Sequence, residues 1–124
     1  MAFWTEPDFD EHELVQLVRD SGSGLTAIVA IHSTNLGPGA GGTRFWHYAQ
    51  PDDAMRDALR LSRGMSYKNA MAGLPMGGGK AVVLLGPGAE KTPGLLAAFG
   101  DAIDALGGRY VTAEDVGATE ADMV

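Results

Sequence analysis

The sequence contains no cysteine among its 124 residues. This absence excludes disulfide bonds, thiolate metal ligands and a cysteine nucleophile. The three histidines, His12, His32 and His47, lack the spacing of a metal-binding motif, so we predict no metal site and expect surface or hydrogen-bonded core residues. A chain without cysteine fits a reducing compartment, and we expect a cytoplasmic location.

Long apolar runs are also lacking. No run approaches the roughly 20 residues of a membrane-spanning helix. The acidic N-terminal segment 1–8 has no apolar core and does not resemble a signal peptide. The formal net charge is −7, so nucleic acids and anionic membranes are expected to be poor partners.

Glycine, in contrast, is abundant, with 18 residues. They gather at 37–42, 73–79, 86–88 and 107–108. Glycine clusters between periodic segments mark turns, or places where a backbone or a ligand approaches closely. We therefore expect loops at these clusters, with open space beside the triple glycine 77–79.

The hydrophobic spacing between these clusters predicts a series of helices and strands. The expected helices span 8–20, 52–72 and 92–106, and the expected strands span 25–32, 43–48, 81–85 and 110–113. In the first helix Asp10 is the expected N-cap, with Glu13 three residues later, and Thr119 is expected to begin a further helix. The order predicts one α/β domain over residues 1–124, with a mixed sheet and helices packed on its faces.

Two glycine runs imitate nucleotide-binding motifs. The segment 37–42 matches G-x-G-x-x-G, but a strand pattern follows where that motif needs a helix. The segment before Lys80 imitates a P-loop, yet Leu74 replaces its first glycine and Ala81 replaces the Ser or Thr that holds magnesium. We therefore predict no phosphate site at either run.

Lysine is scarce, and two of the three lysines lie in the single run 66–80. Lys68 ends the long helix, Lys80 follows the triple glycine, and Asp115 follows the last strand. Because ligands bind at the carboxyl ends of strands in open α/β sheets, these three residues are candidates for one cleft. Alternatives stay open, since a lysine is usually solvated, Lys68 can interact with the helix C-terminus, and Asp115 can begin a helix.

Four ordered motifs, at 37–44, 65–70, 73–80 and 112–117, resemble the N-terminal domain of an amino-acid dehydrogenase family. The family includes the glutamate, leucine, valine and phenylalanine dehydrogenases. The likeness covers nearly the whole chain from about Leu25. It implies the first domain of a two-domain dehydrogenase, and the oxidative deamination of an L-amino acid to a 2-oxo acid and ammonia with NAD⁺.

The resemblance also implies residue roles. The lysine matching Lys68 binds the substrate carboxylate, the lysine matching Lys80 activates water, and the aspartate matching Asp115 relays protons. Gly41 and Gly42 let the substrate lie against the backbone. Physical chemistry agrees, because burial and mutual repulsion push a lysine pKa down toward the range of a general base.

The expected substrate side chain is apolar. Met65, Ala40 and Ala113 are expected to border the substrate, and Ala40 stands where the glutamate enzymes of this family carry a lysine. Ala81–Val83 are more similar to the leucine, valine and phenylalanine branch, whereas Ala113 is more similar to the aliphatic enzymes, because the phenylalanine enzymes tend to carry glycine there. Ala40 is smaller than the leucine common in leucine dehydrogenases, so a larger, even aromatic, side chain remains an alternative.

The family's second domain, a Rossmann fold that binds NAD, is expected after Val124. We therefore expect an excised domain or fragment that shows no dehydrogenase turnover alone. Two alternatives remain for the chain by itself: a self-association module of a homo-oligomer, pairing through the strand 25–32 if it lies on an edge, or an amino-acid binder without chemistry.

Overall fold

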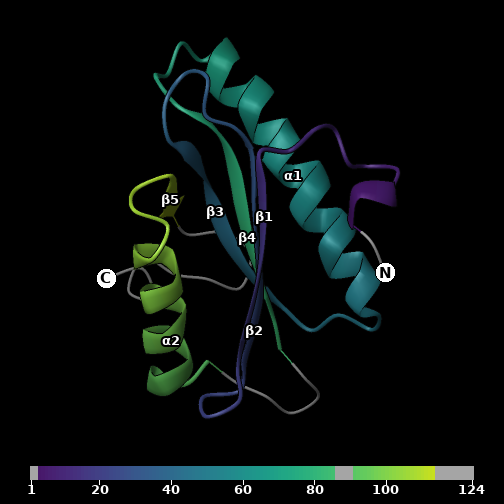
Figure 1. Cartoon of the computed structure of the whole chain (residues 1–124), viewed down its shortest axis with the longest axis vertical. Helices are drawn as coiled ribbons and strands as arrows, with labels where there is room; N and C mark the ends of the chain where they lie inside the picture. The colour runs from purple at the N-terminus through teal and green to yellow at the C-terminus, as the bar shows by residue number, and fades with distance from the viewer. Residues whose placement is uncertain (1–2, 86–90, 114–124) are drawn as a thin grey trace.

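The computed structural model describes residues 3–85 and 91–113 (Figure 1). A 3₁₀ turn, Phe3–Thr5, precedes the sheet. The strands are β1 (Leu14–Asp20), β2 (Leu25–Ser33), β3 (Gly39–Trp46), β4 (Gly77–Leu84) and β5 (Tyr110–Ala113), and the helices are α1 (Pro51–Met71) and α2 (Pro93–Asp104). No helix in this part of the chain is long and apolar enough to cross a membrane.

The five strands form one mixed sheet in the order β1-β2-β4-β3-β5. The strand β2 is antiparallel to both β1 and β4, whereas β3 is parallel to β4 and β5. The helices α1 and α2 lie on opposite sides of the strands (Figure 1). This confirms the predicted α/β class with a mixed sheet and helices on its faces.

Each face of the sheet has its own apolar core. The α2 side buries alternate residues of β2 together with Phe45, Val83, Leu95 and Phe99. The α1 side buries the intervening residues of the central strands, among them Ala30 and Val82, against residues of α1. A strand buried on both faces needs apolar residues at every position, which explains the uninterrupted apolar run of β2.

The predicted helix over 8–20 is wrong, because residues 14–20 form the strand β1. The spacing of Leu14, Leu17 and Val18 fits a helical stripe, but β1 pairs with β2 over its full length, from Leu14 opposite Ile31 onward. The expected capping residue Asp10 instead bonds the His32 ring. The strand 25–32, expected as a possible edge, is internal, and the edge strands are β1 and β5.

Two glycine segments predicted as loops are parts of strands. The strand β3 begins at Gly39, and the triple glycine opens β4. A Cβ at Gly78 would lie 2.2 Å from the backbone nitrogen of Ser66, and one at Gly79 would lie 2.6 Å from the Tyr110 ring. Glycine here lets α1 and the Tyr110 ring approach the sheet closely.

Other expectations are confirmed. The long helix α1 follows Gln50 and ends at Met71, close to the predicted bounds. Thr92 caps α2, because its hydroxyl oxygen accepts a hydrogen bond from the Leu95 backbone at 3.1 Å. A strand, and not a helix, follows each nucleotide-like glycine run, as predicted. The helix expected from Thr119 lies outside the described residues.

Candidate functional site

A cavity of about 610 Å³ opens between the parallel strands and α1. Its lining comes from β3, α1, β4, β5 and the turn before β4: Ala40, Gly41, Gly42, Arg44, Leu61, Met65, Lys68, Met76, Lys80, Val111 and Thr112. Six residues that the sequence singles out therefore meet in one place. Asp115 and the side chain of Ala113 lie outside the described part of the chain.

Lys80 is buried in this cavity wall, with 5% of its surface exposed. Burial is the main cause that lowers the pKa of its amine to about 8. The nearby positive charges of Arg44 and Lys68 lower this pKa further, and the carboxylate of Asp57 partly offsets them. An amine with such a pKa is substantially neutral near pH 8, so it can accept a proton.

Lys68 reaches the same cavity from the last turn of α1. It is exposed, in contrast to Lys80. Its position at the helix end is also the one that favours a cation electrostatically, so the two sequence-based interpretations of Lys68 are compatible. The two lysines thus differ in environment: one amine is solvated and suited to an anion, and the other is buried and suited to proton transfer.

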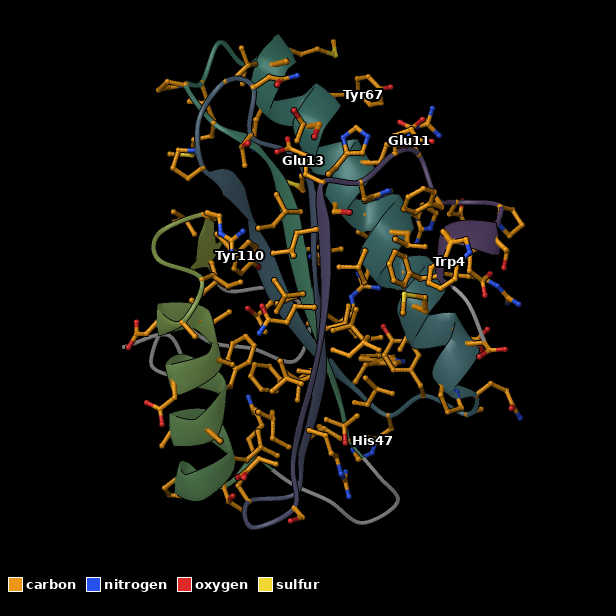
Figure 2. All side chains as sticks on the ribbon, viewed as in Figure 1. Trp4, Glu11, Glu13, His47, Tyr67 and Tyr110 are labelled. Atoms are coloured by element: carbon orange, nitrogen blue, oxygen red, sulfur yellow. The ribbon has the colours of Figure 1, made fainter. Side chains whose placement is uncertain are left out.

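The backbone of β3 forms one wall of the cavity at Gly41 and Gly42. A Cβ at Gly41 would lie 1.8 Å from the carbonyl oxygen of Gly79, so this position requires glycine. The Tyr110 hydroxyl, labelled in Figure 2, donates to the Gly41 carbonyl at 2.9 Å. Burial raises the pKa of Tyr110 to about 12, so the hydroxyl keeps its proton.

Asn69, next to Lys68, is the structural link that sequence reasoning left without a role. Its side chain is buried and donates to the carbonyl oxygens of Gly77 at 2.8 Å and Ala40 at 3.3 Å. The signal available in the sequence was a polar residue inside the lysine motif. The lining residues Arg44, Leu61, Met76, Val111 and Thr112 were also not singled out as site residues.

Ion pairs lie along α1. Arg56 pairs with Asp53 at 3.0 Å, and Arg60 pairs with Asp57 at 3.2 Å. Arg63 pairs outside the helix, because its guanidinium lies 3.3 Å from Asp10. Figure 2 shows the neighbouring Tyr67 at the same end of α1.

The histidines His12 and His32 have hydrogen-bond partners in the core or near it. His12 Nε2 lies 2.8 Å from the Leu59 carbonyl oxygen, and His32 bonds Ser66 and Asp10. Among the described residues no group of three or more His, Cys, Asp or Glu side chains could hold a metal ion. The described part of the chain therefore offers acid–base and anion-binding chemistry from lysines.

This combination defines a class of protein: an α/β domain with an exposed and a buried lysine in one cavity that has apolar walls. The chain matches the model of the Glu/Leu/Phe/Val dehydrogenase dimerisation domain over residues 12–124. It therefore belongs to this family of amino-acid dehydrogenase domains, as the sequence motifs indicated.

Named relatives agree with this membership. Valine dehydrogenase of Streptomyces virginiae is 61% identical over 112 residues, and leucine dehydrogenase of Geobacillus stearothermophilus is 55% identical over 113 residues. These matches cover 90% and 91% of this chain and 31% of each relative. The chain thus spans about a third of the length of these relatives.

A solved structure also shares the fold. L-tryptophan dehydrogenase from Nostoc punctiforme superimposes with a TM-score of 0.85 at 47% identity, over 90% of this chain and 33% of that chain. The relatives' names thus include both aliphatic and aromatic amino acids.

Proposed function

We propose that this chain is the substrate-binding domain of an NAD-dependent dehydrogenase that deaminates an apolar L-amino acid. The observation that carries the proposal is Lys80, a buried lysine with a pKa lowered to about 8, in one cavity with the exposed Lys68. Valine, leucine and tryptophan dehydrogenases as relatives support the reaction class.

Each lysine has a separate part in the proposed reaction. Lys68 binds the substrate α-carboxylate, because its amine is a solvated cation at the cavity. The neutral Lys80 amine takes a proton from the water that attacks the iminium carbon, and so acts as a general base. Asp115 remains a proposed proton relay and lies outside the described residues.

The cofactor is proposed to bind elsewhere. A nicotinamide cofactor supplies the hydride acceptor in this reaction class. Neither glycine run precedes a helix N-terminus, so the described residues do not fit a dinucleotide site. We therefore place the cofactor outside the described residues and expect no turnover from residues 1–124 alone.

The cavity walls support an apolar side chain as substrate. Ala40, Leu61, Met65, Met76 and Val111 supply apolar surface. The cations of the lining are Lys68, Lys80 and Arg44, and the last is paired with Asp57 at 3.3 Å. With Lys68 and Lys80 assigned to the reacting end, the remaining cation of the described lining, Arg44, already has a carboxylate partner, so burial of a side-chain carboxylate would be costly.

The decisive experiment measures NADH formation by the intact protein with L-valine, L-leucine, L-phenylalanine, L-tryptophan and L-glutamate. Lys80→Ala is expected to lower kcat by about 100-fold or more, since a general base is lost. Lys68→Ala is expected mainly to raise KM. Lys91→Ala is the matched control, because Lys91 lies against the Phe45 ring and not in the cavity. An active Lys80→Ala enzyme, or glutamate as the preferred substrate, would contradict the proposal.

The alternative that the protein binds an amino acid without catalysis predicts different results for the same variants. An amino-acid binder without chemistry would show no turnover in any intact form, would lose binding in Lys68→Ala, and would keep binding in Lys80→Ala. Calorimetry with the same amino acids separates this alternative from the dehydrogenase.

A second proposal, homo-oligomerisation through β1, rests on a separate observation. The strand β1 is one of the two edge strands of the sheet, and Leu17 on it is 64% exposed. An edge strand with an exposed apolar side chain can pair with a second copy, and the matched family model describes a dimerisation domain. Sedimentation of Leu17→Lys should show dissociation, whereas Leu36→Lys, at a comparably exposed loop position, should not. A wild-type monomer at high concentration would refute this proposal.

A further inference from the structure

Arg44 is the third cation of the cavity lining, and α1 holds it in place. Its Nη1 lies 3.3 Å from Oδ2 of Asp57, and each side chain is 23% exposed. The Tyr48 hydroxyl donates to the same carboxylate at 2.7 Å, and Arg60 donates to it at 3.2 Å. Three donors on three side chains fix the carboxylate, which in turn fixes the Arg44 guanidinium.

Arg44 and Lys80 share one face of the sheet. In the parallel pair β3–β4, Arg44 lies opposite Val82, which packs on the α1 side. Lys80 is two residues before Val82, so it projects from the same side, and both cations line the cavity. Arg44 therefore places a fixed positive charge next to the proposed general base.

The charges around Lys80 act in opposite directions. Burial is the largest cause of its lowered pKa; Arg44 and Lys68 lower this pKa as well, and Asp57 raises it. From β2, Ala30 lies opposite Lys80, and His32 two residues further on bonds Ser66 and Asp10. Arg44 and Asp57, which pair with each other at 3.3 Å, thus act on this amine in opposite directions.

We propose that Arg44 and Asp57 are a pair of positioning residues that sets the charge state of the Lys80 amine. Arg44 supplies a permanent positive charge at the cavity wall, and Asp57 both holds that charge and offsets part of its field. The catalytic meaning of the pair rests on the proposed function. Its effect on Lys80 is measurable without turnover.

The direction in which each substitution changes the pKa of Lys80 distinguishes this role from a merely structural one. Arg44→Gln leaves the Asp57 carboxylate unbalanced near Lys80, so the pKa of Lys80 should rise by on the order of one pH unit. Asp57→Asn leaves the Arg44 charge unbalanced, so this pKa should fall by a similar amount. The double variant should return close to the wild-type value. An ion pair that only ties β3 to α1 would predict no such opposition.

The test labels the amines of the intact protein with acetic anhydride across a pH series. Mass spectrometry then follows the peptides that contain Lys80, with Lys68 and Lys91 as internal references. Arg60→Gln is the matched control, because it removes an exposed partner of the same carboxylate and should leave the Lys80 inflection unchanged. Circular dichroism checks that each variant is folded.

The proposal is supported if the pKa of Lys80 rises in Arg44→Gln and falls in Asp57→Asn. Shifts in the same direction, or none, overturn it. If Arg44→Gln does not fold, a comparison of Asp57→Asn with Arg60→Gln still tests the proposal. Only Asp57→Asn should lower the pH at which the labelling of Lys80 has its inflection. Arg44→Lys, which keeps the charge, should leave it near the wild-type value.

The pH dependence of kcat separates the two proposals. If both hold, the rise of kcat with pH moves with the Lys80 inflection in each variant. If the pKa of Lys80 shifts as expected but the intact protein shows no dehydrogenase turnover, the role of Arg44 and Asp57 is supported and the proposed function is refuted. Turnover without labelling shifts would refute the pair alone.

Discussion

Asn69 Nδ2 donates a 2.8 Å hydrogen bond to the carbonyl oxygen of Gly77, joining the end of α1 to the start of β4. The same amide donates to the Ala40 carbonyl on β3 at 3.3 Å. One buried side chain thus connects the helix that carries Lys68 to β3 and β4, two of the three parallel strands that line the cavity. The distance between the two lysines of the cavity, Lys68 and Lys80, depends on this link.

Replacing Asn69 by alanine should therefore weaken both the fold and the site. Loss of a buried donor should lower the free energy of unfolding by about 1–3 kcal/mol, measured by urea denaturation. In the intact enzyme KM should rise more than kcat falls, because Lys68 loses its support. The control is Asn35→Ala, at an exposed loop asparagine, which should change stability by less than about 0.5 kcal/mol. Equal effects from the two variants would contradict the prediction.

Two glycine-to-alanine substitutions should have opposite effects on stability. At Gly78 a new Cβ would lie 2.3 Å from the Ser62 carbonyl oxygen and 2.2 Å from the Ser66 nitrogen, so α1 must move away from the sheet. We expect a loss of several kcal/mol, on the order of 3 or more, or failure to fold. At Gly64, within α1, a Cβ meets nothing within 4 Å. Gly64→Ala should stabilise by up to about 1 kcal/mol.

Thermal denaturation of the two variants is the measurement. A tolerated Gly78→Ala would show that α1 does not approach β4 as closely as described. A destabilised Gly64→Ala would show that this helix position has a packing neighbour.

His12 should make stability fall as the pH drops below about 6.5. Its Nδ1 accepts from the Asp10 backbone at 3.1 Å, and its Nε2 donates to the Leu59 carbonyl, so the folded ring is neutral. Burial is the main cause that lowers its pKa below the usual 6.5. The unfolded chain therefore binds a proton first as the pH falls, and stability decreases from about pH 6.5 downward. The slope from one such group is at most about 1.4 kcal/mol per pH unit.

His12→Gln keeps a donor and an acceptor without titrating, so it should flatten this slope in urea denaturation at several pH values. His47→Gln, at an exposed position, should retain the slope. The pKa of Asp10 is held low, chiefly by the His32 hydrogen bond, so its contribution is lost only as the pH falls below about 3.8. An unchanged slope in His12→Gln would assign the pH dependence to other groups.

Local sequence patterns predict those helices and strands whose formation depends on residues close by in the sequence. The apolar run of β2, the stripe of α1 and the Thr92 cap of α2 all lie within the elements they specify. Residues 14–20 have an apolar spacing that fits a helical stripe, yet they form the strand β1. Its pairing with β2 decides the outcome, and tertiary pairing overrides local propensity.

The same contrast between local signals and contacts with distant segments applies to the glycine-containing strands and to the site. The motif residues Lys68 and Lys80 were found because their residue types and flanking glycines are visible in the sequence. The partners of Gly78, Asn69 and Arg44 come from distant segments, so no local pattern reveals them. Burial, which lowers the pKa of Lys80, also becomes definite only once β4 is placed between β2 and β3.

Ala40 should limit the size of the substrate side chain. It lines the cavity together with Met65 and Val111, and its methyl group leaves space that leucine would fill. In the intact enzyme, Ala40→Leu should therefore raise KM for L-tryptophan and L-phenylalanine by about tenfold or more, with a smaller change for L-valine. Val111→Ala, which enlarges the cavity from β5, should shift the preference the other way. Steady-state kinetics with the three amino acids measure both ratios. If Ala40→Leu changes all three KM values equally, the side chain of the substrate does not lie against Ala40, and size selection must come from another wall of the cavity.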